Sequence, residues 1–303
     1  LAGKEGGGIS IVGTIMAKWG LADGCVVVSN TAAAASSAGG VYCAYGTVRH
    51  CTVSENIGSS PTWGIGGIYA LNWSEVSGCF VSSNTGGHSG GFRVGQYTVI
   101  SNCVVVGNEG FAYAGAMYLG AISWIRDCRI LANTGLQVGG IANNGYEVNL
   151  ANCLIAGNLG RVMAGGAVLN SQYAPVRIEA CTFAANVTTN TGSTAYSGGL
   201  YLFFTNIRVR SSIFYENLCG RTAAFNNYYT SGDTNLISFS CATNGPPING
   251  NAPLLPLDQG NLYDPPQFEN PGAGDYRLGA ASPCLNTGLN LDWMAGVLDL
   301  DGQ

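Results

Sequence analysis

The sequence is poor in charged residues. Asp, Glu, Lys and Arg make up 10% of its 303 residues, whereas about 25% is usual in soluble domains. The 12 Lys and Arg residues form no basic run and the net charge is −5, so no nucleic-acid partner is predicted. The sequence holds no run of about 20 apolar residues and therefore predicts no transmembrane segment.

Histidine is scarcer still, and the two that occur are isolated. His50 is followed by Cys51, and His88 precedes a glycine pair, with no second ligand at the spacing of a metal site. We therefore predict no metal and no cofactor. A starting Met is also missing, since the chain opens at Leu1, and we expect a processed or truncated protein.

Glycine and cysteine, in contrast, are plentiful. The chain has 46 Gly and 11 Cys, and its 47% content of hydrophobic residues argues against disorder. Seven of the cysteines recur at intervals of 24–28 residues, and each is followed five residues later by an asparagine. The two series are Cys25, Cys51, Cys79, Cys103, Cys128, Cys153 and Cys181, and Asn30, Asn56, Asn84, Asn108, Asn133, Asn158 and Asn186; Ser212 and Asn217 continue them.

A second marker keeps the same period. Glycine pairs, one with alanine in second place, stand at 39–40, 66–67, 90–91, 115–116, 139–140, 165–166 and 198–199. Two markers locked to one period of this length indicate a solenoid. Between the markers, hydrophobic residues alternate over three to five positions, which is typical of short strands and leaves no room for an amphipathic helix.

These patterns predict an all-β fold, a right-handed parallel β-helix of about nine coils with three short strands each and an irregular C-terminal cap. Residues 1–217 are expected to hold the repeats. Residues 218–303 are expected to hold a final coil and a non-repetitive capping or anchor-like segment. A cap is expected because the bare strand edges at the end of a solenoid invite further pairing.

Each marker has an expected place in the coil. The cysteines are predicted to form an inward ladder of small apolar groups. The asparagines are expected in the following turn, in the left-handed region, with hydrogen bonds from coil to coil. The glycine pairs are expected at sharp corners where a Cβ would clash. Disulfides along the ladder are the less favoured alternative, because stacked side chains point the same way, while a disulfide among Cys219, Cys241 and Cys284 stays open; Cys43 also lies off the ladder.

The repeats resemble those of chlamydial polymorphic outer-membrane proteins. Residues 53–56, 155–158 and 183–186 are similar to the FxxN element of that family, with Val or Ile often in place of Phe. Residues 67–69, 166–168 and 199–201 are similar to its GGAI-type element. Members of that family are surface-exposed β-helical adhesins, so the resemblance implies a similar passenger domain.

The C-terminal segment resembles the end of bacterial choice-of-anchor Q proteins. The resemblance lies in residues 264–268 (DPPQF), 274–278 (GDYRL), 282–288 (SPCLNTG) and 299–302 (DLDG). That family joins a right-handed β-helix to a surface-anchoring C-terminus, which implies export and a secreted or cell-surface location. It implies little about activity.

Enzymes on β-helices that act on polysaccharides need an acid and a base. On the strand that precedes each cysteine, the residues two and four positions before the cysteine are expected to face outward. These two columns hold one acid each, Glu179 and Glu75 respectively, and the two acids lie several coils apart, so no catalytic residue is predicted. The densest charged cluster is Arg177, Glu179, Arg208 and Arg210. It is interpreted either as a surface ion-pair network or as a strip that binds acidic sugars.

Aromatic residues gather in the first half of the chain. Trp63 and Trp73 are candidates for sugar stacking or for an interface, with packing in turns as the alternative. The leading hypothesis is a non-enzymatic extracellular or cell-surface protein with a structural or adhesin-like role, possible partners being a polysaccharide or a cell-surface ligand. The alternatives are an enzyme that binds or degrades polysaccharides, and a subunit that assembles head-to-tail into a filament.

Overall fold

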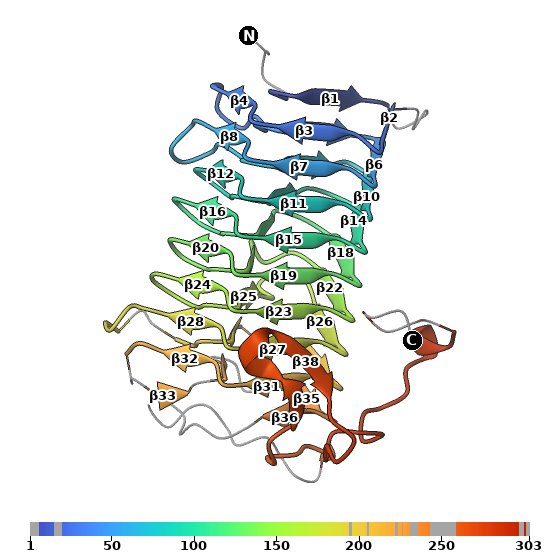
Figure 1. Cartoon of the computed structure of the whole chain (residues 1–303), viewed down its shortest axis with the longest axis vertical. Coiled ribbons are helices and arrows are strands. Elements are labelled where there is room, and N and C mark those ends of the chain that lie inside the picture. Colours follow the sequence, from blue (N-terminus) through green and yellow to red (C-terminus); the bar gives the residue numbers. More distant parts are fainter. Residues whose placement is uncertain are drawn as a thin grey trace.

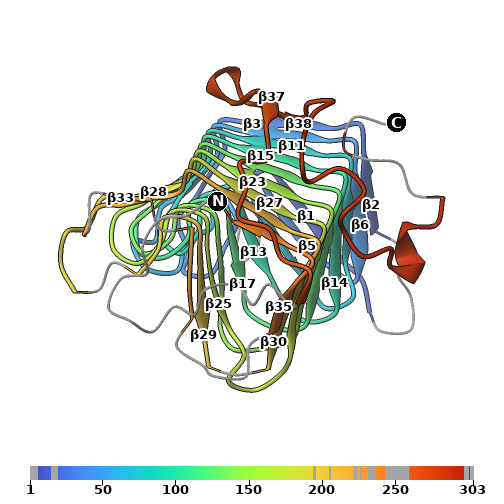
Figure 2. The same cartoon turned by 90° about the horizontal axis from the view of Figure 1, so that it is seen from below.

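The structure is a computed structural model, and it describes residues 6–14, 20–193, 196–204, 206–221, 224–225, 227–230, 236–242, 259–296 and 300. Four nine-stranded sheets run the length of a single solenoid (Figure 1). Their strands are parallel except where β33 joins β32 at the end of one sheet. The coils wind in a right-handed sense, as the sequence predicted (Figures 1 and 2).

The four sheets are named A to D in the order in which each coil visits them. Sheet A holds β1 (Ile9–Val12), β5 (Val41–Ala44), β9 (Ile68–Leu71), β13 (Phe92–Val94), β17 (Met117–Leu119), β21 (Ile141–Asn143), β25 (Ala167–Asn170), β29 (Leu200–Phe203) and β34 (Tyr228–Thr230). Sheet B holds β2 (Gly20–Asp23), β6 (Gly46–Arg49), β10 (Glu75–Ser77), β14 (Thr98–Ser101), β18 (Ser123–Arg126), β22 (Val148–Ala151), β26 (Val176–Glu179), β30 (Ile207–Arg210) and β35 (Leu236–Ser238).

Sheet C holds β3 (Val26–Val28), β7 (Thr52–Ser54), β11 (Phe80–Ser82), β15 (Val104–Val106), β19 (Arg129–Leu131), β23 (Leu154–Ala156), β27 (Thr182–Ala184), β31 (Ile213–Tyr215) and β36 (Cys241–Ala242). Sheet D is made of two-residue strands: β4 (Thr31–Ala32), β8 (Ile57–Gly58), β12 (Thr85–Gly86), β16 (Glu109–Gly110), β20 (Thr134–Gly135), β24 (Leu159–Gly160), β28 (Val187–Thr188), β32 (Leu218–Cys219) and β33 (Ala224–Phe225). Sheets A, B and C correspond to the three predicted strands, and the short strand of sheet D is an addition that the sequence did not predict.

The core is a set of inward columns, one residue per coil. In sheet B the column runs through Val48, Val76, Ile100, Ile125, Leu150, Ile178 and Val209, all of which are buried. Sheets A and C contribute equivalent columns, which include Phe92 and Phe183. Aliphatic burial of this kind stabilises by about 25 cal/mol per Å², so the alternating pattern in the sequence follows directly from the need to bury one face of each strand.

The asparagines occupy the corner between sheets C and D and form a continuous ladder, as predicted. The Oδ1 atom of each accepts the main-chain N–H and the side-chain amide of the asparagine one coil before it, as in Asn84→Asn108, where both distances are 3.0 Å. The ladder runs from Asn30 to Asn217, and Asn227 completes it after an interval of 10 residues.

The predicted left-handed conformation, however, is one residue out of place. It belongs to the residue before each asparagine, such as Glu55 with φ 57° and Ala132 with φ 51°. This residue turns the chain, so that the asparagine side chain faces inward, where its amide is buried and hydrogen-bonded on every side. The prediction that the asparagines lie at a corner was therefore correct, but the reason given for it, their preference for the left-handed region, was wrong.

The cysteine column fills the corner between sheets B and C and is buried from Cys51 to Cys181, while Cys25 in the first coil is partly exposed. Each thiol lies over a main-chain carbonyl two residues earlier, as in Cys128 Sγ to Arg126 O at 3.1 Å. All eleven cysteines are free thiols, so the alternative of ladder disulfides is not realised. Burial raises the pKa of Cys51 to about 11 and also raises the pKa values of Cys128 and Cys153.

The glycine pairs occupy the corner between sheets D and A, as predicted. A Cβ on Gly66 would lie 2.4 Å from the carbonyl oxygen of Gly90 in the next coil, and a Cβ on Gly90 would lie 2.4 Å from the main-chain nitrogen of Glu109. These glycines have no positive φ. They are required because neighbouring coils approach closely there, and not because of their own backbone angles.

The C-terminal segment leaves the repeat and folds back along the solenoid. The antiparallel strands β37 (Phe268–Asn270) and β38 (Asp275–Leu278) lie outside sheet C (Figure 2). The short 3₁₀ turns η3 (Pro271–Ala273) and η4 (Asp292–Met294) belong to the same segment. In the part of the chain that is described, no helix has the length and apolar character needed to cross a membrane.

Candidate functional site

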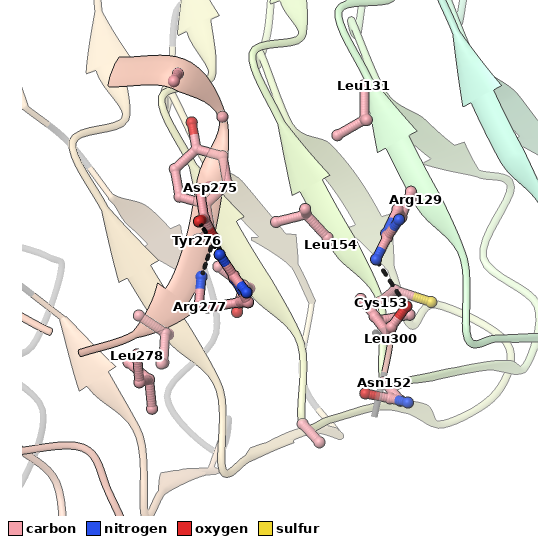
Figure 3. Close-up of a pocket in the computed structure, with 15 residues that line it drawn as sticks. Arg129, Leu131, Asn152, Cys153, Leu154, Asp275, Tyr276, Arg277, Leu278 and Leu300 are labelled. Carbon is pink, nitrogen blue, oxygen red and sulfur yellow. Dashed lines mark hydrogen bonds and ion pairs between the residues drawn. The ribbon is translucent and has the colours of Figure 1, made fainter. Parts of the chain in front are cut away.

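A groove lies between the outer face of sheet C and the β37–β38 hairpin. Its volume is about 600 Å³. The floor is formed by outward side chains of successive coils, Arg129, Leu154, Thr182 and Ile213, which are neighbours in the strand register. The wall is formed by residues 273–278 and by Leu300 (Figure 3).

Two arginines set the charge of this groove. Arg129 donates from Nη2 to the carbonyl of Leu300 at 2.7 Å, while Arg277 donates from Nε to Asp275 at 2.9 Å (Figure 3). The hydrogen bonds from Arg277 lower the pKa of Asp275 to about 2. A carboxylate held in this state stays ionised and does not supply a proton near neutral pH. The groove is therefore suited to contact with an elongated ligand or segment rather than to acid–base chemistry by Asp275.

The structure divides the predicted charged cluster. Arg177 donates to Glu147 at 3.0 Å and to Asn149 at 3.2 Å. Glu179 instead accepts a hydrogen bond at 2.8 Å from the indole of Trp293, which comes from η4.

Arg208 and Arg210 are the strand neighbours of Arg177 and Glu179. Among the residues that the structure describes, no ion pair joins Glu179 to any of the three arginines. The surface network is thus smaller than the sequence predicted, and Glu179 holds the C-terminal segment against sheet B.

The two predicted tryptophans belong to separate stacks. Trp63, which is 47% exposed, lies in the loop before β9 and stacks on His88 with ring centroids 5.1 Å apart. Trp73 lies in the turn between sheets A and B and stacks on Tyr97 at 4.3 Å. The prediction that these two residues bind a sugar or form an interface stays a prediction, and the sequence did not predict their partners.

The partners of Trp63 are the principal site residues that the sequence did not predict. His88 is buried, and its Nδ1 has no hydrogen-bond partner. Arg93 on the outer face of β13 lies over the rings of Trp63 and Tyr69 at 5.6 and 5.0 Å. A signal for Arg93 was present, because it directly follows the inward residue Phe92, at the position held by Tyr69 and Tyr118 in the adjoining coils.

The remaining histidine and the acidic residues near the C-terminus do not add to these sites. His50 lies 3.2 Å from the carboxylate of Asp23, which also pairs with Arg49 at 2.8 Å. Among the described residues, no group of three His, Cys, Asp or Glu side chains is placed to hold a metal ion. Asp299 and Asp301, part of the motif that resembles an anchor segment, lie outside the described residues.

No family model matches this chain, and no curated protein or solved structure is detectably similar to it.

Proposed function

We propose that this protein is a non-enzymatic β-solenoid of the cell surface or the extracellular space, with a structural or adhesin-like role. The observation that carries the proposal is the unbroken asparagine ladder from Asn30 to Asn227. Buried amide ladders of this kind fix each coil on the next through bonds that are shielded from water. Such a ladder makes a rigid rod whose long outer faces can present a ligand-binding surface away from the point of attachment.

The groove supports this role. Its carboxylate, Asp275, is paired with Arg277 within the same hairpin, and its floor carries no acidic side chain among Arg129, Leu154, Thr182 and Ile213. This combination favours binding over proton transfer. The resemblance to surface-exposed β-helical families points in the same direction and motivates the proposed location.

The test separates binding from turnover on one set of samples. The protein is run in affinity gels that contain neutral or acidic polysaccharides, and the same polymers are assayed for new reducing ends and for the ultraviolet absorbance of lyase products. We expect retention by at least one polymer without products. Products would contradict the non-enzymatic role, and the absence of retention on every polymer would contradict the adhesin-like one.

The filament alternative has one structural feature in its favour. Strands β1 to β4 are the outermost strands of the four sheets at the N-terminal end. Edge strands of this kind can pair with another chain. The opposite end departs from the repeat, since β33 is antiparallel and Leu262 continues only sheet C through a bridge with Cys241. We therefore expect dispersed particles in negative-stain electron micrographs, and regular fibres would favour the filament instead.

A further inference from the structure

The outer face of sheet A carries two rows of side chains that meet around one arginine. The first row lies in the loops that precede sheet A and contains Trp63, His88 and Tyr113, with successive ring centroids 5.1 and 4.9 Å apart. The second row lies on sheet A itself, where Tyr69, Arg93 and Tyr118 occupy one register column. His88 and Tyr118 join the rows, with their centroids 4.0 Å apart.

Arg93 is a cation without a counter-charge in this cluster. Its Nη1 atom is buried and has no hydrogen-bond partner, and among the described residues no carboxylate pairs with it. The rings of Trp63 and Tyr69 offset part of the cost of taking this charge out of water. Arg93 as a whole is only half-buried, but its Nη1 group has lost its hydrogen bonds to water and has gained none within the protein, which is costly.

His88 adds an unsatisfied polar atom but no charge. It is 1% exposed, and burial together with the neighbouring charge of Arg93 lowers its pKa to about 3. The cluster is thus a single, partly buried positive charge bordered by aromatic faces. Trp63 and Tyr113, at 47% and 42% exposure, present their rings to solvent on either side of the buried His88.

We propose that this cluster binds a carboxylated sugar residue of an acidic polysaccharide. The carboxylate would pair with the part of the Arg93 guanidinium that is left accessible beside the buried Nη1 atom, since a guanidinium and a carboxylate form strong charge-assisted hydrogen bonds. The pyranose ring would lie against the exposed face of Trp63, since the C–H face of a sugar and the face of an indole are complementary. The inference rests on the adhesin-like part of the proposed function and gives that part a ligand class and a location.

The test uses tetragalacturonic acid as the ligand, measured by titration calorimetry on the full chain. Cellotetraose serves as the neutral sugar and inorganic phosphate as the anion without a sugar ring. The variants are Arg93→Gln and Trp63→Ala. Their matched controls are Arg126→Gln and Trp124→Ala, two residues on the exposed face of β18. Thermal unfolding of each variant verifies that it is folded.

We expect tetragalacturonic acid to bind, and to bind more weakly as salt rises, with no measurable binding of cellotetraose. Arg93→Gln and Trp63→Ala should each weaken binding by about tenfold or more, which corresponds to about 1.4 kcal/mol. The two controls should stay within about twofold of the wild type.

Three results would overturn the inference. These are no binding of tetragalacturonic acid, binding that the Arg93 and Trp63 variants leave unchanged, and binding of phosphate as tight as that of the sugar acid. If the protein is retained by polysaccharides while the two variants behave like the wild type, the adhesin-like function stands and only this site is rejected.

Discussion

At the corner between sheets C and D, two adjacent residues have different structural roles. One residue adopts the left-handed conformation, such as Ser83 with φ 53°, and the next is the asparagine whose amide is buried. Turning and hydrogen bonding are thereby separated, which explains why the turning residue varies among Ser, Glu, Ala and Gly while the asparagine recurs in every coil. The invariant residue in a repeat is the one whose hydrogen bonds have no substitute.

Replacement of a central ladder residue should therefore be costly. In Asn108→Ala, the buried main-chain N–H of Asn84 loses its acceptor and the carbonyl of Val81 loses its donor. We expect the free energy of unfolding, measured by urea titration, to fall by about 2–4 kcal/mol. Asn144→Ala is the control, since Asn144 is exposed in the turn after β21 and should cost less than about 0.5 kcal/mol. Equal losses in the two variants would contradict the role of the ladder.

The thiols should differ strongly in reactivity. The hydrogen bond from Cys241 lowers the pKa of Cys284, which is partly exposed, whereas burial raises the pKa values of Cys128 and Cys153. Because the thiolate is the nucleophile, iodoacetamide should modify Cys284 well before the buried ladder cysteines. Mass spectrometry of the native protein over time measures this order. Cys241→Ala provides the comparison, since loss of the donor thiol should slow the modification of Cys284.

At the scale of the element, the corner between sheets D and A depends on close approach of the backbone. In Gly90→Ala the new Cβ would lie 2.4 Å from the main-chain nitrogen of Glu109, so the two coils must separate. We expect a loss of about 3 kcal/mol. Gly107→Ala is the control, because Gly107 has a positive φ of 64° but open space around it, and Ala132 occupies the equivalent position one coil later. That variant should lose about 1 kcal/mol, and a comparable loss at both sites in thermal or urea unfolding would count against the packing argument.

The loop that carries His88 should make the fold sensitive to acid. The pKa of His88 is lowered from its usual 6.5 to about 3 by burial and by Arg93, and its ring is enclosed by Trp63, Tyr113 and Tyr118. The unfolded chain therefore binds a proton more readily than the folded one between these two pH values. The stability contributed by neutral His88 is complete above pH 6.5 and is lost as the pH falls toward 3.

The variant His88→Phe keeps an aromatic ring at this position and removes the titration. Its unfolding temperature relative to the wild type should rise steadily as the pH is lowered from 7 to 4, as measured by scanning calorimetry. His50→Phe is the matched control, because the side chain of His50 is 68% exposed. A constant difference between His88→Phe and the wild type across this pH range would refute the argument.

The elements also show how far the sequence could be read. Sheets A, B and C were predictable because buried and exposed residues alternate along each of their strands, and the same alternation recurs in every repeat. The two-residue strands of sheet D leave no alternation to detect, since their second residue is usually a glycine, as in Gly86 and Gly110. Asn227 was missed because the ladder residue returns after 10 residues rather than after a full coil.

The site residues likewise fall into two groups, those whose position the repeat fixes and those whose position it does not. The column that holds Arg93 could be inferred from the register, but its contact with Trp63 depends on the shape of the loop before β9, which no repeat constrains. The β37–β38 hairpin and its groove lie in the one segment without periodicity. The separation of Glu179 from its predicted arginine partners likewise depends on Trp293, a residue 114 positions away in the sequence.

At the scale of the whole molecule, each coil packs mainly on its immediate neighbours; the exceptions include the C-terminal segment and the ion pair of Arg161 with Glu109, which spans two coils. Stability in such an array depends on nearest-neighbour interfaces, and unfolding starts most easily at the ends. We expect amide hydrogen exchange to be slower in central β15 than in β3 of the first coil by at least about tenfold, or about 1.4 kcal/mol. Peptide-level exchange measured by mass spectrometry gives this profile, and uniform protection along the rod would contradict it.

The asparagine ladder also gives the solenoid a dipole along its axis. In every link the carbonyl oxygen faces the preceding coil and an amide N–H faces the following one, as in Asn56→Asn84→Asn108. Amide dipoles aligned head to tail reinforce one another, as they do along an α-helix. The N-terminal end of the column thus carries partial negative charge and the C-terminal end partial positive charge. A coil that is added before Asn30 must offer a donor and not an acceptor, so the solenoid specifies the orientation of any neighbour that continues it.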